Sequence, residues 1–316
     1  MYTHAMAQVA LEEKIFFIDV YTPSIKWFSE KKLTIDGMQL NEEGYRIFSS
    51  FLSNTLFGQG EKGKEIDFEE LRARVLDKNW YWQNDFKMPN GVHVFGRRYD
   101  PFGSDNYPDE LKKIRELTQI RDTAIWSFMQ NSPYDVALAD GQTQELAAVE
   151  TNYRNTEEVS YLYGEEALAT LTVPKGYEIE LFASEETFPD LANPVQLSFD
   201  DKGRLWVATM PSYPHYKPGD AKPNDKLLIL EDTNGDGKAD QQTVFADGLH
   251  LPIGFELAAE GVYISQGNHL KLYKDVDGDD RADEVEMLLS GFDDHDTHHV
   301  ISAFTVDPSG AIYMGE

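Results

Sequence analysis

Hydrophobic residues recur at helical spacing in the first half of the chain and in short, turn-bounded runs in the second half. DFEELRARVLDKNWYWQ predicts an amphipathic helix capped by Asp67, and PDELKKIRELTQIRDTAIWSFMQ predicts a second helix that begins at Pro108. From about residue 171 onward, β-rich runs alternate with Asp, Gly, Pro and Asn turns, which predicts an all-β domain. The expected apolar face of the second helix comprises Leu111, Ile114, Leu117, Ile120, Ala124 and Ile125.

These patterns divide the chain into four regions. Residues 1–60 predict part of an α/β module, in which a helix over Ala5–Lys14 leads into a buried strand, IFFIDV, at residues 15–20. Residues 61–135 predict a helical extension and residues 136–170 a linker with a short helix. Residues 171–316 predict the β-rich domain, with strands in TLTVPKGYEIELFA, VQLSFDDKGRLWVAT, KLLILED, GVYISQ, HLKLYKD and AIYMGE.

The β-rich region contains an internal repeat. LLILEDTNGDGKADQQTVFADGL (227–249) aligns without a gap with LKLYKDVDGDDRADEVEMLLSGF (270–292), at a shift of 43 residues. A period of roughly 40–50 residues with several strands per unit is typical of β-propeller blades. Two to three such units precede the end of the chain at AIYMGE, so we expect a partial propeller with an open sheet edge, and a chain that is a piece of a longer protein.

Each repeat contains an acidic loop that suits a hard cation. The first places oxygen ligands at positions one, three, five and nine, with Gly237 at position six, and the second has Asp280 in place of the glycine. Thr243 at position twelve and the flanking strands exclude an EF-hand, and the loops resemble the calcium loops of integrin-type propellers. The alternative is a metal-free hairpin tip. The candidate Ca²⁺ ligands are Asp232, Asn234, Asp236 and Asp240, and Asp275, Asp277, Asp279 and Asp283.

Composition restricts the partners that the chain is expected to bind. The chain contains 28 Lys and Arg residues and 56 Asp and Glu residues, which gives a net charge of -28 and disfavours binding to nucleic acid and to anionic membrane surfaces. The absence of cysteine excludes disulfides, thiolate metal sites and covalently attached haem within this chain. No apolar run is long enough for a membrane span, and residues 1–23 lack the pattern of a signal peptide.

LTIDGMQLNEEGYRIFSSFL, residues 33–52, resembles the last conserved block of SGNH/GDSL hydrolases. In that family an Asp orients a His, which activates a Ser near the start of the domain. The resemblance implies that Asp36 takes the Asp position, whereas Gln39 stands where the His is required. An amide cannot accept and return a proton near pH 7, so we expect a degenerate carbohydrate-esterase relic without hydrolase activity.

GFDDHDTHHVISAFTVDPSGAIYMGE, residues 291–316, carries three histidines in one loop. With the repeats, it resembles the soluble quinoprotein glucose/sorbosone dehydrogenases, and the chain resembles still more closely the secreted "membrane-bound dehydrogenase domain" proteins of Planctomycetes and related (PVC-type) bacteria. Lines such as VPKGYEIELFASEETFPDLANPVQLSFDDKGRLWVA and LPIGFEL carry that resemblance. The resemblance implies that His299, with His298 beside it, takes the proton from a sugar hydroxyl. His295 and His298 with Asp293 or Asp296 could instead hold a metal, or the histidines could be structural.

The resemblance also implies the cofactors, the partners and the location of the whole protein. It implies a periplasmic or extracellular oxidoreductase that uses pyrroloquinoline quinone (PQQ) or a haem-linked cytochrome c domain and acts on a carbohydrate or another neutral small molecule. The alternative from another class is a non-enzymatic, calcium-braced propeller that binds glycans or proteins. Arg97 and Arg98, in NGVHVFGRRYDPFG, predict either a binding segment or ion pairs that fix this segment to the α/β module.

Overall fold

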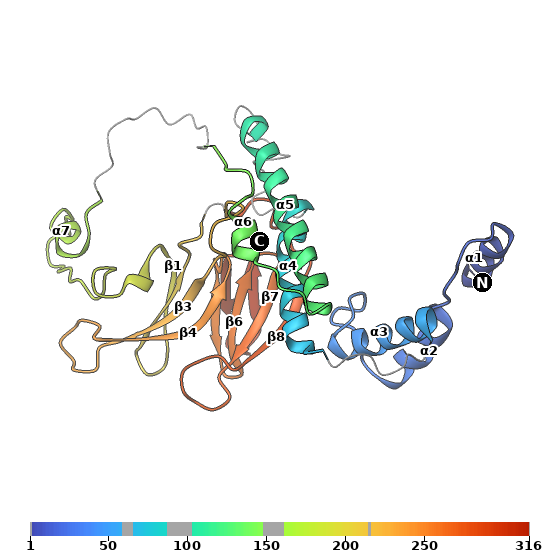
Figure 1. Ribbon diagram of the computed structural model, residues 1–316. Coiled ribbons are helices and arrows are strands. Elements are labelled where there is room, and N and C mark those ends of the chain that lie inside the picture. The colour runs from blue at the N-terminus through green and yellow to red at the C-terminus, as the bar shows by residue number, and fades with distance from the viewer. Residues whose placement is uncertain (1, 59–65, 87–102, 148–160, 214–215, 316) are drawn as a thin grey trace. The chain divides into compact units, whose positions relative to one another are not determined.

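The computed structural model describes residues 2–58, 66–86, 103–147, 161–213 and 216–315 (Figure 1). The chain forms two compact units, Met1–Glu65 and Ile66–Glu316. The first is helical, and the second contains a helical pair followed by three antiparallel sheets. Arg97 and Arg98 lie outside the described residues, so the two readings of their segment stay open.

The first unit consists of α1 (Tyr2–Glu12), α2 (Tyr21–Glu30) and α3 (Glu42–Phe57). The expectation of a buried strand at residues 15–20 is wrong: the segment has no regular structure, and Phe16 is 72% exposed. A strand needs a neighbour for its backbone groups, and the described part of this unit offers only an isolated bridge between Thr34 and Leu40. The unit is therefore helical as far as it is described, and an α/β arrangement is not formed within it.

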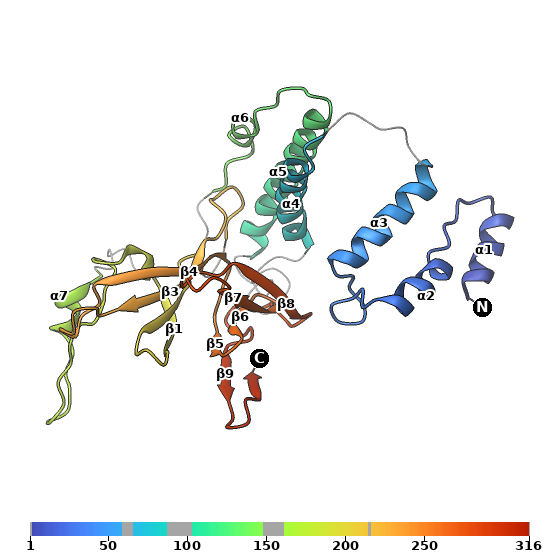
Figure 2. The same cartoon turned by 90° about the horizontal axis from the view of Figure 1, so that it is seen from below.

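The second unit opens with α4 (Phe68–Phe86) and α5 (Gly103–Met129), which lie side by side (Figure 2). The cap at Asp67 is confirmed, because its carboxylate accepts hydrogen bonds from the amides of Glu69 and Glu70. The expected start at Pro108 is wrong, since α5 already begins at Gly103. The apolar face predicted for α5 is buried at its centre, as shown by Ile114, Leu117 and Ala124.

A buried arginine ties the helical pair to the short helix α6 (Val136–Asp140). Arg121, on α5, forms a two-pronged ion pair with Asp140 and donates a hydrogen bond of 3.1 Å to Asp77 of α4. Its guanidinium also lies 4.4 Å from the ring centroid of Tyr81. Since the Arg121 side chain is only 8% exposed, these contacts satisfy a charge that would otherwise be costly to bury.

In the described part of the chain, ten strands follow the helices. In each of the three sheets, consecutive strands pair antiparallel in chain order, and the structure contains strands within the predicted runs at 195–209, 226–232, 261–266 and 269–275 and at residues 312–315 of the last one. The first sheet contains β1 (Pro194–Phe199), β2 (Leu205–Thr209), β3 (Asp225–Glu231) and β4 (Gln241–Leu249). The second contains β5 (Phe255–Ala258), β6 (Gly261–Gln266), β7 (His269–Lys274) and β8 (Glu284–Ser290). The third contains β9 (Ala303–Val306) and β10 (Ile312–Gly315).

The strand expected within residues 170–183 is not formed. The segment between α7 (Gly164–Leu168) and the 3-10 turn η2 (Pro189–Leu191) has no strand, and Tyr177 is 71% exposed. Its residues favour a strand, but no neighbouring strand pairs with it in the described part of the chain. A single backbone hydrogen bond, from the amide of Ala239 to the carbonyl of Phe182, connects it to an acidic loop. Propensity alone does not make a strand without a ladder partner.

The main core lies between the first and second sheets. It is formed by Trp206, Ala208, Leu227, Ile229, Phe245, Ala246, Leu249, Phe255, Val262, Ile264 and Tyr273. The side-chain amide of Gln196 fixes the two sheets at their start: it accepts from the amide of Phe255 and donates to its carbonyl, both at 2.7 Å. The opposite face of the first sheet is covered by the segment that contains Phe182, Phe188 and Leu191.

Two edges of the sheets carry the loops of interest. The connections between β2 and β3 (described at 210–213 and 216–224), between β4 and β5 (250–254) and between β8 and β9 (291–302) leave at one edge, which we call the histidine edge. The acidic loops 232–240 and 275–283 leave at the opposite edge, which we call the acidic edge. Among the described residues the three sheets do not close into a barrel or a ring, and none of the described helices is long and apolar enough to span a bilayer.

Candidate functional site

A buried carboxylate organises the loops of the histidine edge. Asp225, at the start of β3, is fully buried and accepts hydrogen bonds from the amide and the hydroxyl of Ser212, at 3.0 and 2.6 Å. It also accepts from the amide of Leu251 at 2.8 Å. Leu251 has a φ of 55°, a left-handed conformation that is unusual for leucine, so the contact with Asp225 holds strained backbone in place.

Of the two candidate bases, the structure orients His298, which the sequence resemblance placed second to His299. His298 Nδ1 lies 2.6 Å from Asp296 Oδ1, and the ring of His298 contacts the ring of Tyr213 edge-on, with centroids 5.2 Å apart. Tyr213 follows Ser212, so Asp225 indirectly fixes the ring that packs against His298. His299 is exposed, and its ring centroid lies 6.3 Å from that of His298.

The contact between Asp296 and His298 determines which nitrogen can act as a base. An ionised carboxylate only accepts hydrogen bonds, so a neutral His298 ring in this contact would carry its proton on Nδ1 and present the lone pair of Nε2. This is the arrangement in which a carboxylate orients an imidazole for proton transfer. The Asp296 side chain is 15% exposed, so bulk water competes little for it.

The metal alternative for the histidine loop finds no support in the described residues. The groups whose ligand atoms converge are the carboxylates of the second acidic loop, and neither His295 nor His298 takes part in such a group. The amide of His295 donates to the carboxylate of Asp293 at 2.9 Å, which is a local turn contact.

Residues of α4 and of the 210–224 loop complete this edge, and sequence patterns did not reveal them. Trp80 packs against Tyr216 and His250, with ring centroids 5.9 and 5.7 Å away, and Lys222 forms an ion pair with Asp77. Burial raises the pKa of Tyr216, so its hydroxyl stays protonated. The Asp-x-His spacing of Asp296 and His298 was the one sequence signal for the dyad, whereas Tyr213 had none.

The first acidic loop has its side chains turned toward its own backbone. Asp232 accepts hydrogen bonds from the amides of Gly235, Asp236 and Gly237, at 2.7 to 3.2 Å. Those contacts, of which the one from Gly237 is strongest, lower the pKa of Asp232. Asp240 accepts from the hydroxyl of Thr233.

The second loop brings three carboxylates together. One oxygen from each of Asp275, Asp277 and Asp283 lies within 4.8 Å of the others. Repulsion from Asp279, then from Asp283, raises the pKa of Asp277 above its ordinary value. Hard oxygen ligands that repel one another fit a divalent cation such as Ca²⁺, which would remove that repulsion. The equivalent residues of the first loop are Asp232, Asn234 and Asp240.

The residue at position six of the second loop joins the two sheets. Asp280 has a φ of 65°, which confirms that it takes the left-handed conformation of Gly237. Its carboxylate accepts two hydrogen bonds, of 2.7 and 3.0 Å, from Arg204 of the preceding sheet. Arg204 also donates to Asp200 at 2.8 Å, and the indole of Trp206 donates to the same oxygen at 3.0 Å.

Three residues of the hydrolase-like block, Asp36, Asn41 and Gly44, have local structural roles. Asp36 is exposed and accepts from the amides of Met38 and Gln39, so it closes a turn and does not orient a base. Asn41 caps α3 by accepting from the amide of Gly44 at 2.9 Å. A Cβ on Gly44 would lie 2.3 Å from the carbonyl oxygen of Leu33, so the start of α3 requires glycine where it packs against Leu33.

The loop that carries His298 supplies no cation that could hold a quinone tricarboxylate. The loop 291–302 contains Asp293, Asp294 and Asp296 and neither lysine nor arginine. Binding the three carboxylates of PQQ requires cations, whereas the negative charge of this loop would repel those carboxylates.

Comparison with known proteins places only the β-rich part. Residues 164–316, just under half of the chain, match the family described as a domain of unknown function (DUF7133). Neither the curated proteins nor the solved structures contain a significant match to this chain.

Proposed function

We propose that the β-rich part forms the first blades of a β-propeller in a secreted sugar dehydrogenase-like protein, and that His298 accepts a proton from the substrate hydroxyl. The contact of 2.6 Å between Asp296 and His298 carries this proposal, because it leaves Nε2 of a neutral imidazole as the available base. Half-buried Tyr213 provides an aromatic neighbour against which a substrate ring can lie.

The blade arrangement is supported by the way successive sheets stack. The amide of Ala282 in the second acidic loop donates to the carbonyl of Phe245 in the first sheet at 2.8 Å. The amide of Ala239, 43 residues earlier, donates to the carbonyl of Phe182 at the same distance. Each repeat therefore packs on the segment before it through the same contact, and residues around Phe182 take the place of a preceding outer strand. Stacking of this kind generates propellers and solenoids.

The described residues contribute proton transfer and positioning but no redox group. Asp296 orients His298, and Asp225 fixes the loop from which Tyr213 contacts it. Hydride removal needs an acceptor, and the loop 291–302 supplies no cation to hold PQQ, so no step is assigned to it. A covalently attached c-type haem would have to come from another polypeptide or another part of the whole protein, since this chain contains no cysteine.

Sugar oxidation by the protein as its gene encodes it tests the proposal. We expect oxidation of an aldose or alditol with an artificial electron acceptor, a loss of at least 100-fold in kcat for His298→Asn, and a smaller loss for Asp296→Asn. His295→Asn is the matched control on the same loop and should retain turnover. Equal activity of wild type and His298→Asn would reject His298 as the base, and the absence of sugar oxidation in wild type would reject the dehydrogenase proposal.

A second candidate function is a calcium-braced propeller that binds glycans or proteins without turnover. The converging oxygens of Asp275, Asp277 and Asp283 favour it. Calcium-dependent stability without sugar oxidation would support this candidate over the first one.

For the first unit, we propose a catalytically silent C-terminal part of an SGNH-type α/β module. The turn at Asp36 and the capped helix α3 support the likeness, and the exposed Gln39 supports the absence of chemistry. In this proposal the segment 15–20 becomes a strand only when a sheet from elsewhere pairs with it. Clear acetyl-ester hydrolysis that depends on Asp36 would contradict the silent state.

A further inference from the structure

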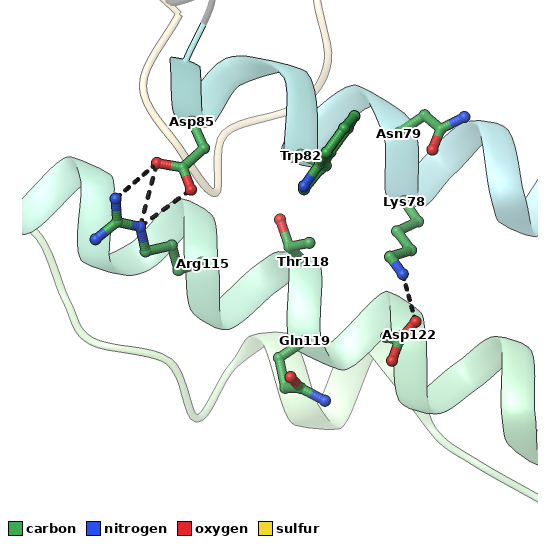
Figure 3. A pocket seen from close by; sticks show the side chains of 8 residues that line it. All are labelled: Lys78, Asn79, Trp82, Asp85, Arg115, Thr118, Gln119 and Asp122. Carbon is green, nitrogen blue, oxygen red and sulfur yellow. Dashed lines mark hydrogen bonds and ion pairs between the residues drawn. The ribbon is translucent and has the colours of Figure 1, made fainter. Parts of the chain in front are cut away.

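The groove between α4 and α5 contains a partly exposed tryptophan between two ion pairs. The groove has a volume of about 480 Å³, and Figure 3 shows Trp82 above Thr118, with one ion pair on each side. Arg115 and Asp85 form the pair at one end, at 3.0 Å, and Lys78 and Asp122 form the pair at the other. The volume lies within the range of about 300–1,000 Å³ that is typical of small-molecule sites.

The charges in this groove cancel. Two cations and two anions line it, and each is already paired with its opposite across the helices (Figure 3). A charged ligand would therefore have to displace an existing ion pair, whereas a neutral ligand would not. In a chain with a net charge of -28, such a locally balanced groove is distinct from the acidic surface expected on average.

Polar groups for hydrogen bonding remain available at the rim. The side-chain amides of Asn79 and Gln119 are not engaged within the described part of the chain, and each offers two donors and an acceptor. Trp82 is 50% exposed and packs edge-on against Phe86, at 4.6 Å between ring centroids, so one aromatic surface is held in place while part of it faces solvent.

We infer that this groove binds a neutral saccharide. The carbon-bound hydrogens of a pyranose ring form an apolar face that can cover the indole of Trp82, and its hydroxyls can both donate to and accept from the amides and the outer atoms of the ion pairs. The helices are held together by the buried Arg121, so the groove is formed before a ligand arrives.

This site is separate from the histidine edge. Trp80 packs against Tyr216 of the histidine edge, and Trp82 follows two residues later, about 200° around the helix. The inference therefore does not rest on the proposed dehydrogenase function, and it is tested by binding and not by turnover.

Calorimetric titration of the chain with cellotriose and maltotriose, and with trigalacturonate and chitosan trimer as charged probes, tests the inference. We expect millimolar or tighter binding of at least one neutral trisaccharide, little dependence on salt, and at least a tenfold loss of affinity in Trp82→Ala. Trp82→Phe, which keeps an aromatic face, should lose less.

Trp126→Ala is the matched control, because Trp126 is also exposed, lies on α5 and does not line the groove. Circular dichroism and the melting temperature establish that each variant is folded. No binding of either neutral trisaccharide, tighter binding of a charged probe, or an equal loss in Trp126→Ala would overturn the inference.

Discussion

Replacement of Arg204 should destabilise the contact between the first and second sheets more than any exposed ion pair would. Arg204→Met keeps the length and apolar stem of the side chain but removes three hydrogen bonds, one to Asp200 and two to Asp280. The side chains of Arg204 and Asp200 are each 10% exposed, so the carboxylate of Asp200 would lose its charged partner in a nearly buried position and keep the hydrogen bond from Trp206. Breaking a buried pair in this way costs about 3–5 kcal/mol.

The expected value lies at the low end of that range. The side chain of Asp280 is 35% exposed, so water replaces part of what Arg204 provided. We expect Arg204→Met to lower the free energy of unfolding by about 3 kcal/mol, which corresponds to a fall of about 6–12 °C in melting temperature for a unit of this size. Lys238→Met is the control: its pair with Glu165 spans 3.4 Å between two well-exposed side chains and should change stability little.

The same ion pairs predict a pH dependence. The hydrogen bond from Arg204 lowers the pKa of Asp280. Burial acts to raise the pKa of Asp200, but the hydrogen bonds from Trp206 and Arg204 lower it overall. A carboxyl with a lowered folded pKa stabilises the fold above its unfolded pKa, about 3.9, and loses that effect as the pH falls through the folded value. The difference between wild type and Arg204→Met should therefore be largest near neutral pH and shrink below about pH 4.

Urea unfolding of the two proteins at pH 7 and at pH 3 measures both effects. A double-mutant cycle with Asp280→Gly isolates the pair, since glycine relieves the left-handed strain at that position while removing the carboxylate. A difference below about 1 kcal/mol at pH 7, or a difference that grows at low pH, would show that Arg204 does not hold the sheets together as described.

Three further outcomes follow from individual contacts. Gly44→Ala should lower the stability of the first unit by thermal circular dichroism, because its Cβ would meet the Leu33 carbonyl at 2.3 Å, whereas Gly141→Ala, with nothing closer than 3.6 Å, should be tolerated. Calcium, but not magnesium at equal concentration, should raise the melting temperature, and Asp275→Asn should remove part of that gain; no calcium effect in wild type would decide for metal-free loops. Gln39→His should not create acetyl-ester hydrolysis, because Asp36 is committed to backbone amides and this chain shows no nucleophile block; measurable turnover above buffer would contradict the structural account of that turn.

Features that depend on neighbours in sequence were predictable. The cap at Asp67, the apolar face of α5 and the left-handed residue at Asp280 were all read from short stretches, and the structure contains them. The 43-residue repeat likewise reappears as two four-stranded sheets with the same strand order. Caps, amphipathic spacing and turn chemistry are fixed within a few residues, so they survive in any tertiary context.

Features that need a partner from far along the chain were decided by tertiary structure. The β-rich stretches at 15–20 and 170–183 looked like strands, yet they have no backbone ladder in the described chain. Tyr213 contacts His298, Arg204 pairs with Asp280, and Lys78 pairs with Asp122 because folding brings distant segments together. Sequence establishes which side chains can accept a proton, bind a cation or pack on a sugar, but only packing establishes which of them meet, since hydrogen bonds and ion pairs act over a few ångströms.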